Sequence, residues 1–176
     1  MSPNPLSPYA AAKFAGEKYC QIFYRIYGLE TVCLRYFNIF GPRQDPNSQY
    51  SAVIPKFISS VKRGEPPLIF GNGEQSRDFT FVENVVEANF LACKAENVGG
   101  GVFNIASGKR YRLLELVRRI NDFLGSKVEP TFAERRKGDV VHSLADISKA
   151  ERALSYRPAV QFPEGLERTI PLIDAS

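Results

Sequence analysis

The chain has 176 residues, with 23 Lys and Arg against 19 Asp and Glu, which leaves a formal net charge of +4. Its length fits one domain, or one domain with a small appendage, since domains average about 150 residues. Hydrophobic residues make up 44% and charged residues 24% of the sequence, which excludes a disordered or fibrous protein. No apolar run approaches the roughly 20 residues that span a bilayer, and the opening MSPNP lacks the features of a secretory signal. We therefore predict a cytoplasmic protein with no membrane partner.

The sequence also argues against metal and nucleic-acid binding. Cys20, Cys33 and Cys93 are widely spaced and His142 is the only histidine, so we predict buried, unreactive thiols and no zinc site. The pI is near 9.0, but basic residues are spread along the chain. The densest basic cluster, ERRKGD at 134–139, is bracketed by acids, unlike a nucleic-acid-binding stripe. A small anionic ligand is still compatible with this charge.

Helices and strands are predicted to alternate. The first helix runs to residue 27, because Ser7 can cap it, Pro8 fits its first turn and Gly28 ends it. β-Branched and aromatic residues predict a strand over 31–37, and a polar loop leads to a helix over about 52–62. Further strands are predicted over 67–70, 77–81, 102–105, 128–132 and 140–144, and further helices over 82–96, 113–124, 147–154 and 164–173. This alternation predicts an α/β fold.

Helical periodicity predicts which faces of two helices are buried. In the helix over 82–96, the predicted buried residues are Val85, Val86, Phe90 and Cys93. In the helix over 113–124, they are Leu113, Leu114, Leu116, Val117, Ile120 and Leu124.

Tyr9 and Lys13 are four residues apart in the first predicted helix, so their side chains project from one face. An ammonium group beside a phenol favours the phenolate and is expected to lower the pKa of the tyrosine. Such a pair can move a proton to or from a sugar hydroxyl. Taken alone, the same two residues also suit an ordinary exposed helix surface.

Four motifs occur in one order: SPYAAAK at 7–13, RYFNIFGP at 35–42, RDFTFV at 77–82 and RKGD at 136–139. This series resembles the extended short-chain dehydrogenase/reductase superfamily, specifically its NAD-dependent nucleotide-sugar epimerases and dehydratases. The resemblance extends to ADISKA at 145–150 and so covers essentially the whole chain. RQDPN at 43–47, AVIPK at 52–56, SRDF at 76–79 and HSL at 142–144 are most similar to the UDP-N-acetylglucosamine and UDP-glucose 4-epimerases.

The resemblance implies roles for individual residues. Tyr9 and Lys13 match the family's catalytic tyrosine and its lysine partner, which also contact the cofactor, and Tyr36 and Phe37 fall at the nicotinamide end of NAD. The residues expected to bind the UDP-sugar are Asn38, Gln44, Ala52, Val53, Arg77, Arg136, Asp139 and Ser143.

Within the predicted substrate set, Asn38, Arg77 and Arg136 match residues that contact the diphosphate, and Asp139 matches an acid that binds ribose hydroxyls. Guanidinium groups suit a diphosphate because they form paired, charge-assisted hydrogen bonds. The small Ser143 leaves volume for an acetamido group, where relatives restricted to smaller sugars carry a bulky aromatic residue. Read separately, each arginine could be a surface ion pair and Asn38 an ordinary turn residue.

The resemblance also implies the architecture. Residues 1–45 are expected to form a truncated remnant of a Rossmann-type sheet, a helix plus a strand that carries the Tyr–Lys pair. Residues 46–176 are expected to form a small mixed α/β domain that binds the nucleotide-sugar. The Gly-rich turn that binds the NAD pyrophosphate in the family is missing, because GNGEQ at 71–75 lacks the required strand–turn–helix context. NAD is therefore a cofactor implied by the family alone.

Without a Rossmann half, the first helix would lose the cover of its apolar side chains, which include Phe14, Ile22, Phe23 and Ile26. We therefore predict a homo-oligomer, or a complex with a separately encoded Rossmann partner. For function, the first hypothesis is the UDP-sugar-binding, catalytic-tyrosine half of a UDP-sugar 4-epimerase-like protein, with little or no activity alone. The alternative is a non-catalytic nucleotide-sugar-binding module. A 4,6-dehydratase stays open, whereas the sequence offers no residues for NAD-independent chemistry.

Overall fold

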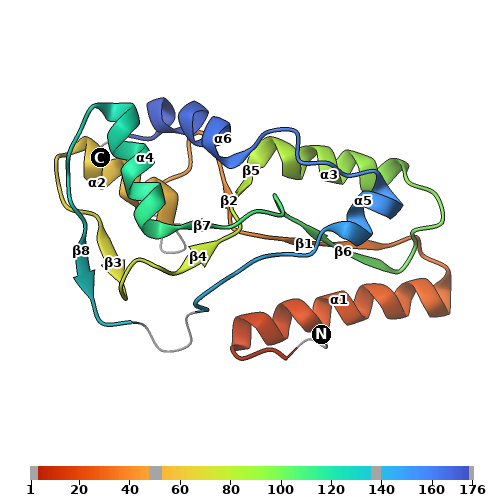
Figure 1. Cartoon of the computed structure of the whole chain (residues 1–176). Coiled ribbons are helices and arrows are strands. Elements are labelled where there is room, and N and C mark those ends of the chain that lie inside the picture. Colours follow the sequence, from red (N-terminus) through yellow and green to blue (C-terminus); the bar gives the residue numbers. More distant parts are fainter. Residues whose placement is uncertain (1–3, 48–52, 136–139, 175–176) are drawn as a thin grey trace.

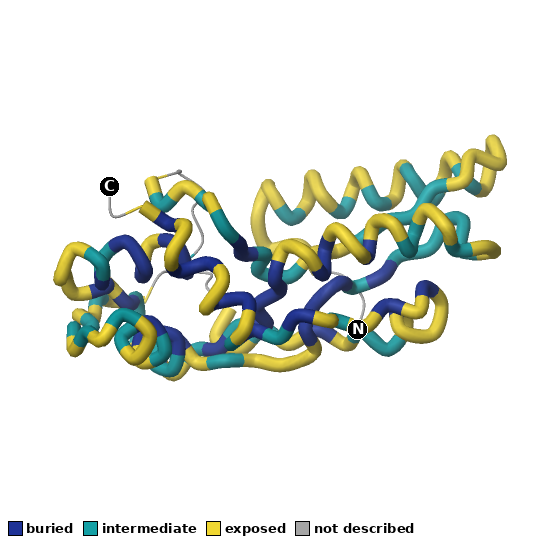
Figure 2. Tube along the Cα trace, turned by 90° about the horizontal axis from the view of Figure 1, so that it is seen from above, coloured by how far each residue is buried: buried dark blue, intermediate teal, exposed yellow. Residues whose placement is uncertain are grey.

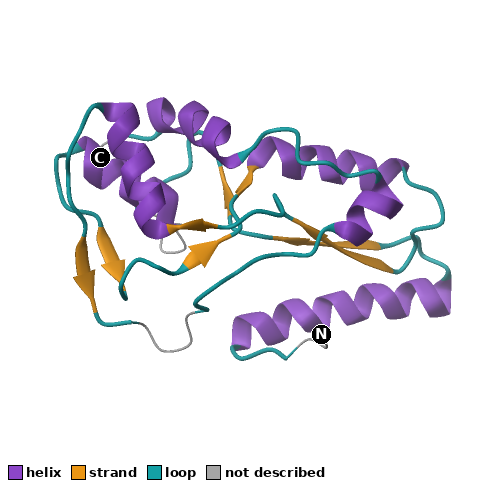
Figure 3. Ribbon diagram, viewed as in Figure 1, coloured by secondary structure: helices purple, strands orange, loops and turns teal. Residues whose placement is uncertain are grey.

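A computed structural model describes residues 4–47, 53–135 and 140–174 (Figure 1). In chain order its elements are α1 (Pro8–Tyr27), β1 (Val32–Tyr36), β2 (Ile39–Phe40), α2 (Val53–Lys62), β3 (Leu68–Phe70), β4 (Ser76–Arg77), β5 (Thr80–Phe81), α3 (Val82–Lys94), β6 (Gly101–Ile105), β7 (Tyr111–Arg112), α4 (Leu113–Leu124), β8 (Thr131–Ala133), α5 (Ser148–Leu154), α6 (Phe162–Thr169) and a final 3₁₀ turn (Ile170–Leu172). The α/β prediction is confirmed, and Figure 3 shows helices and short strands interleaved along the chain.

The predicted ends of α1 are confirmed by their capping groups. The Ser7 hydroxyl oxygen accepts a hydrogen bond from the Ala10 N–H at 3.1 Å. At the other end Gly28 adopts the left-handed conformation (φ 66°) and donates its N–H to the Tyr24 carbonyl. None of the twenty residues of α1 is buried, so this helix lies along the outside of the molecule (Figure 2).

The described strands form four short two-stranded sheets. β1 pairs in parallel with β6, β2 with β5 and β3 with β8, whereas β4 and β7 are antiparallel. β1 lies within the predicted segment 1–45, but its partner β6 lies within 46–176. The two predicted segments therefore share a sheet, and a boundary between them near residue 45 stays a prediction. Within the described ranges β1 has no strand on its other edge.

Two hydrophobic cores hold these elements together. The larger core packs α2, α4 and α6 around aromatic rings, with Phe162 stacked on Phe79 at 5.1 Å and tilted against Tyr111 at 4.4 Å between centroids. The smaller core joins β6, α3 and α5 around the fully buried Tyr156. The Tyr156 hydroxyl donates to the Ala106 carbonyl at 2.9 Å, and burial raises the pKa of this phenol. All six apolar residues predicted for the inner face of α4 belong to the larger core or pack against it.

The predicted buried face of α3 was wrong in part. Val85 is buried, but Val86, Phe90 and Cys93 are exposed. The buried positions include Asn84, whose amide bonds the Val160 backbone N–H and carbonyl at 3.0 and 2.7 Å. A polar residue thus takes an inner position because a distant segment satisfies its hydrogen bonds. The prediction of three buried thiols was wrong as well, since Cys20 and Cys33 are half-buried and Cys93 is exposed.

Two strand predictions also differ from the structure. The strand expected over 77–81 is broken into β4 and β5, with Asp78 and Phe79 between them. The strand expected over 140–144 is reduced to one bridge, between His142 and Ser76. In both places the backbone bonds instead to segments distant in the sequence. The two segments, 77–81 and 140–144, lie side by side at the candidate site.

Candidate functional site

The predicted catalytic pair faces a cavity between α1 and β1. This cavity has a volume of about 840 Å³, and Tyr9, Lys13 and Tyr36 line it. The Lys13 Nζ lies 5.6 Å from the centroid of the Tyr9 ring, and the tyrosine is 70% exposed. The helical spacing therefore brings the ammonium and the phenol together at a surface that a ligand can reach.

Glu17, one turn after Lys13, ties this helix to the sheet. Its two carboxylate oxygens accept hydrogen bonds from the Nε and Nη2 of Arg35 on β1, at 2.7 and 2.8 Å. The carboxylate side chain is only 9% exposed. The Thr31 hydroxyl adds a bond to the Cys20 carbonyl at 2.8 Å. Because α1 buries none of its residues, these polar contacts hold the Tyr–Lys pair over β1.

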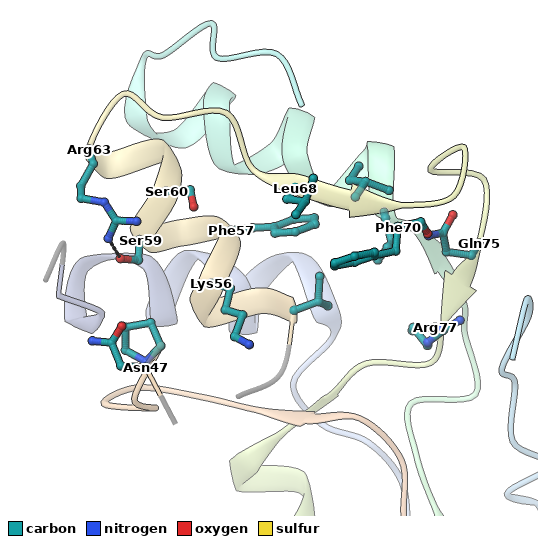
Figure 4. Close-up of a pocket in the computed structure, with 14 residues that line it drawn as sticks. Asn47, Lys56, Phe57, Ser59, Ser60, Arg63, Leu68, Phe70, Gln75 and Arg77 are labelled. Atoms are coloured by element: carbon teal, nitrogen blue, oxygen red, sulfur yellow. Dashed lines mark hydrogen bonds between the residues drawn. The ribbon is translucent and has the colours of Figure 1, made fainter. Parts of the chain in front are cut away.

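A second cavity, of about 510 Å³, lies between α2 and the strands β3 and β4 (Figure 4). Leu68 and Phe70 form an apolar wall, and Lys56 lines the cavity from α2. Arg77 and Arg63 stand at opposite ends (Figure 4). Arg63 bonds the Ser59 hydroxyl at 2.6 Å. The cavity therefore offers a flat apolar wall with a guanidinium group at each end.

Arg77 also borders a third cavity, of about 260 Å³, that Arg135 lines as well. The Arg77 Nη1 donates to the Ser76 carbonyl at 3.0 Å and to the Val141 carbonyl at 3.2 Å. The segment that contains Val141 follows residues 136–139 and runs beside β4, with the Ser143 N–H bonded to the Ser76 carbonyl at 3.0 Å. Two arginines from distant parts of the sequence therefore line one small cavity.

Asn38 connects the two regions of the site. Its φ of 36° is unusual for a non-glycine residue, and its Nδ2 donates to the Asp78 carbonyl at 2.9 Å. Its neighbours Tyr36 and Ile39 line the cavity of the Tyr–Lys pair, while Asp78 adjoins Arg77. Half of the Asn38 amide is thus engaged with the backbone, and the residue joins the end of β1, beside the Tyr–Lys cavity, to the segment that carries Arg77.

Only some of the other predicted site residues line one of the three cavities. Val53 lines the cavity of Figure 4. Phe37 is half-buried and donates its N–H to Ile105, and Tyr36 bonds the Asn89 Oδ1 at 3.0 Å. Gln44 is half-buried on the loop after β2, and among the described residues its Oε1 has no hydrogen-bond partner. Ser143 lies outside the three cavities.

Three of the predicted substrate-binding residues, Ala52, Arg136 and Asp139, lie outside the described residues.

Several cavity residues were missed by the sequence reasoning. Leu68 and Phe70 alternate around the fully buried Ile69, so the period of two in the predicted strand over 67–70 already placed them on one face. Arg135 stands next to the predicted Arg136, but no signal in the sequence distinguishes its role. Gln75, which donates to the Phe70 carbonyl at 2.6 Å, carried no signal at all.

Comparisons with known proteins decide the family. Residues 1–106 match the NAD dependent epimerase/dehydratase family. The chain belongs to this family. The structure of UDP-glucose 4-epimerase from Thermotoga maritima, solved with UDP-glucose, superposes with a TM-score of 0.91 at 40% identity over 96% of this chain and 54% of its own. That of UDP-N-acetylglucosamine 4-epimerase from Methanobrevibacter ruminantium, in complex with UDP-N-acetylmuramic acid, superposes at 0.90 and 47% identity, with 96% and 54% coverage.

A curated relative agrees with these structures. The UDP-glucose 4-epimerase of Mycolicibacterium smegmatis is 36% identical over 170 residues, which are 97% of this chain and 54% of the relative. This epimerase/dehydratase family chain thus spans about half the length of the relatives that it matches. Across the described ranges, every helix is too short or too polar to traverse a lipid bilayer.

Proposed function

We propose that this chain is the UDP-sugar-binding, catalytic-tyrosine half of an NAD-dependent UDP-sugar 4-epimerase. The observation that carries the proposal is the position of Arg77, which borders both the cavity with the apolar wall and the cavity that Arg135 lines. A nucleoside diphosphate combines a flat base with a compact dianion. Two matching features adjoin here, an apolar wall and a small cavity that two arginines line.

In this proposal the base lies against Leu68, Phe70 and Val53, and the diphosphate lies at Arg77. Planar guanidinium groups bind phosphate oxygens through paired hydrogen bonds, and charge assistance makes these about twice as strong as neutral ones. Arg136 adjoins Arg135 in the sequence and is assigned to the same diphosphate, with Asp139 assigned to the ribose hydroxyls. Gln44 and Ala52 complete the proposed substrate-binding set. The small Ser143 accommodates an acetamido substituent.

Tyr9 is the proposed acid/base and Lys13 its partner. The phenolate would take the proton from the sugar 4-hydroxyl, and the phenol would return a proton after the keto sugar has rotated. The Lys13 ammonium lies beside the ring, with its Nζ 5.6 Å from the ring centroid. Asn38 orients the sugar and the adjoining phosphate.

The residues of this chain fit one end of NAD. Tyr9, Lys13 and Tyr36 line a cavity of about 840 Å³ that suits a nicotinamide riboside, with Phe37 next along the chain. The sequence contains no Gly-rich strand–turn–helix for the pyrophosphate. When bound, NAD supplies the hydride acceptor and donor, while this chain orients the sugar and moves the proton.

The surface around β1 suits a Rossmann-type partner half. The open edge of β1 lies between the cavity of the Tyr–Lys pair and another of about 700 Å³ bordered by α3. An added parallel strand with its helices would border both cavities and complete the cofactor site. We propose residues 1–45 as the remnant that receives this half and residues 46–176 as the nucleotide-sugar-binding domain.

The second candidate is a nucleotide-sugar-binding module without catalysis. It is favoured by the separation of the two regions, since the cavity of Arg77 shares no lining residue with that of Tyr9 and Lys13. Arg77 could then bind a UDP-sugar without any contribution from the phenol.

Calorimetric titration with UDP, UDP-N-acetylglucosamine and NAD tests the proposal. We expect UDP and the UDP-sugar to bind and the variant Arg77→Met to weaken both by about 10- to 100-fold, the equivalent of a charged hydrogen bond. Arg118→Met, at an exposed arginine on α4, is the matched control and should bind as the parent does. Failure of UDP to bind the parent chain would contradict the proposal. NAD binding favours the enzymatic half, and UDP-sugar binding without NAD favours the module.

A further inference from the structure

The carboxylate of Asp78 is fully buried, and four donors surround it. Its Oδ1 accepts from the Ser107 N–H at 2.9 Å and the Ser107 hydroxyl at 2.6 Å, and its Oδ2 accepts from the Gly108 N–H at 3.1 Å and the Ala145 N–H at 3.3 Å. Burying a carboxylate is costly unless its oxygens are paired. This one is paired entirely with groups from the turn after β6 and from the chain before α5.

We propose that Asp78 is a positioning residue that holds the guanidinium group of Arg77 at the diphosphate. This inference rests on the proposed function and deepens it. Asp78 makes no direct contact with the ligand in this scheme. It acts through the segments that its carboxylate ties together.

Residues 140–145 form what we call the return segment, which follows residues 136–139, outside the described structure. Its N-terminal part is held on β4, because the Ser76 N–H donates to the Val141 carbonyl and the Ser76 hydroxyl bonds the His142 Nδ1, at 3.0 and 2.9 Å. Its C-terminal end is held by the bond from Ala145 to Asp78. Figure 1 shows this segment passing beside β4 on its way to α5. The return segment is thus anchored at both ends.

The return segment contacts Arg77 and lines the same cavity as Arg135. The Val141 carbonyl, on the return segment, is one of the two acceptors that hold the Arg77 Nη1. Arg135 precedes the return segment and shares the cavity of about 260 Å³ with Arg77 and Val141. Displacement of the return segment would therefore release Arg77 and change the cavity that Arg135 also lines.

The four donors around Asp78 require a carboxylate. An ionised carboxylate accepts on both oxygens and donates nothing, so it can take all four bonds. An asparagine amide would direct its NH₂ at two donors, either those of Ser107 or the N–H groups of Gly108 and Ala145. Those buried donors would lose their acceptor, which costs more than the absence of a bond.

The test compares UDP with uridine, which lacks the diphosphate. Both affinities are measured by ¹⁵N-HSQC titration of the parent chain, Asp78→Asn and the exposed-carboxylate control Asp122→Asn on α4. For Asp78→Asn we expect at least a 10-fold loss of UDP affinity and less than a twofold change for uridine. The control should match the parent for both ligands. Equal losses for UDP and uridine, or no loss for either, would overturn the inference.

Two further measurements cover the other outcomes. If Asp78→Asn does not fold, Ser107→Ala removes one donor and should weaken UDP binding by about threefold while uridine binding is unaffected. Unchanged UDP binding by that variant would overturn the proposal.

If the parent chain binds no UDP, the proposed function fails. Amide hydrogen exchange then tests whether Asp78 anchors the return segment. The Ser143 and Ala145 N–H groups should exchange faster in whichever variant folds than in the parent chain, and equal rates would refute the inference.

Discussion

At the scale of single residues, burial and neighbouring groups give the three cysteines different chemistry. Cys20 on α1 and Cys33 on β1 are half-buried and line the cavity of the Tyr–Lys pair, while Cys93 projects from the exposed side of α3. Burial, and then the adjacent Cys20 thiol, raise the pKa of the Cys33 thiol from 9.0 to about 11. Because the thiolate is the reactive form, Cys33 is protected chemically as well as sterically.

Alkylation with iodoacetamide at pH 8, followed by peptide mass spectrometry, should label Cys93 first and Cys33 last. The rate at Cys33 should go on rising as the pH approaches 11, because its thiolate forms only there. A folded-state pKa raised above the unfolded value stabilises the fold below pH 9, and that contribution is lost as the pH rises through about 11. Unfolding in urea should make the three labelling rates similar. Labelling of Cys33 in the folded chain as fast as Cys93 would contradict this account.

At the scale of elements, α1 differs from the other helices in how it is held. α2 and α4 bury Ile54, Ile58, Leu116 and Ile120 completely in the larger core, whereas α1 buries nothing and relies on polar contacts with β1 and its flanking loops. A helix held in this way can open without disturbing the core. The predicted catalytic pair is therefore carried by a helix that has no buried residue.

Arg35→Met should release α1 locally. We expect faster amide hydrogen exchange over α1, with the rest of the chain unchanged, and a fall of less than about 1 kcal/mol in the free energy of unfolding, since Arg35 is partly exposed. Arg25→Met, at an exposed arginine of the same helix, is the matched control. Exchanging the charges, Glu17→Arg with Arg35→Glu, should restore part of the protection. Faster exchange throughout the chain would show instead that Arg35 supports the whole fold.

At the scale of the whole molecule, apolar side chains are exposed on one helix that has no cover in the described structure. Ile22, Phe23 and Ile26 of α1 are 44–66% exposed. Ile22 and Ile26 are four residues apart and so share one side of α1, whereas Glu17 and Cys20 line the cavity beside β1. Such a surface favours association, because it removes apolar area from water.

Light scattering coupled to size-exclusion chromatography should show self-association of the parent chain at micromolar concentrations. The double variant Ile22→Glu with Ile26→Glu should shift the mass toward the monomer, because charges disfavour burial of this face. Arg118→Glu, at an exposed position of α4, should leave the mass unchanged. A parent chain that is monomeric up to tens of micromolar, without additives, would contradict self-association through α1.

Properties that depend on neighbours in the sequence were predictable. The ends of α1 follow from Ser7 and Gly28, and the inner face of α4 follows from its period, because helical hydrogen bonds and side-chain neighbours lie within four residues. The four motifs likewise pointed to the family that the comparisons show. Tyr9 and Lys13 could be paired in advance for the same reason, since one helical turn separates them.

Properties that depend on distant segments emerged only in the folded chain. Asn84 is buried because Val160 satisfies its amide, and the strand expected over 77–81 breaks where Asp78 turns inward to Ser107 and Ala145. No periodicity records such contacts, because loop closure brings together groups that are 29 to 76 residues apart. The meeting of Arg77 with Arg135 at one cavity, like the open edge of β1, is therefore a consequence of packing: each depends on which distant backbone groups satisfy one another once water has been excluded.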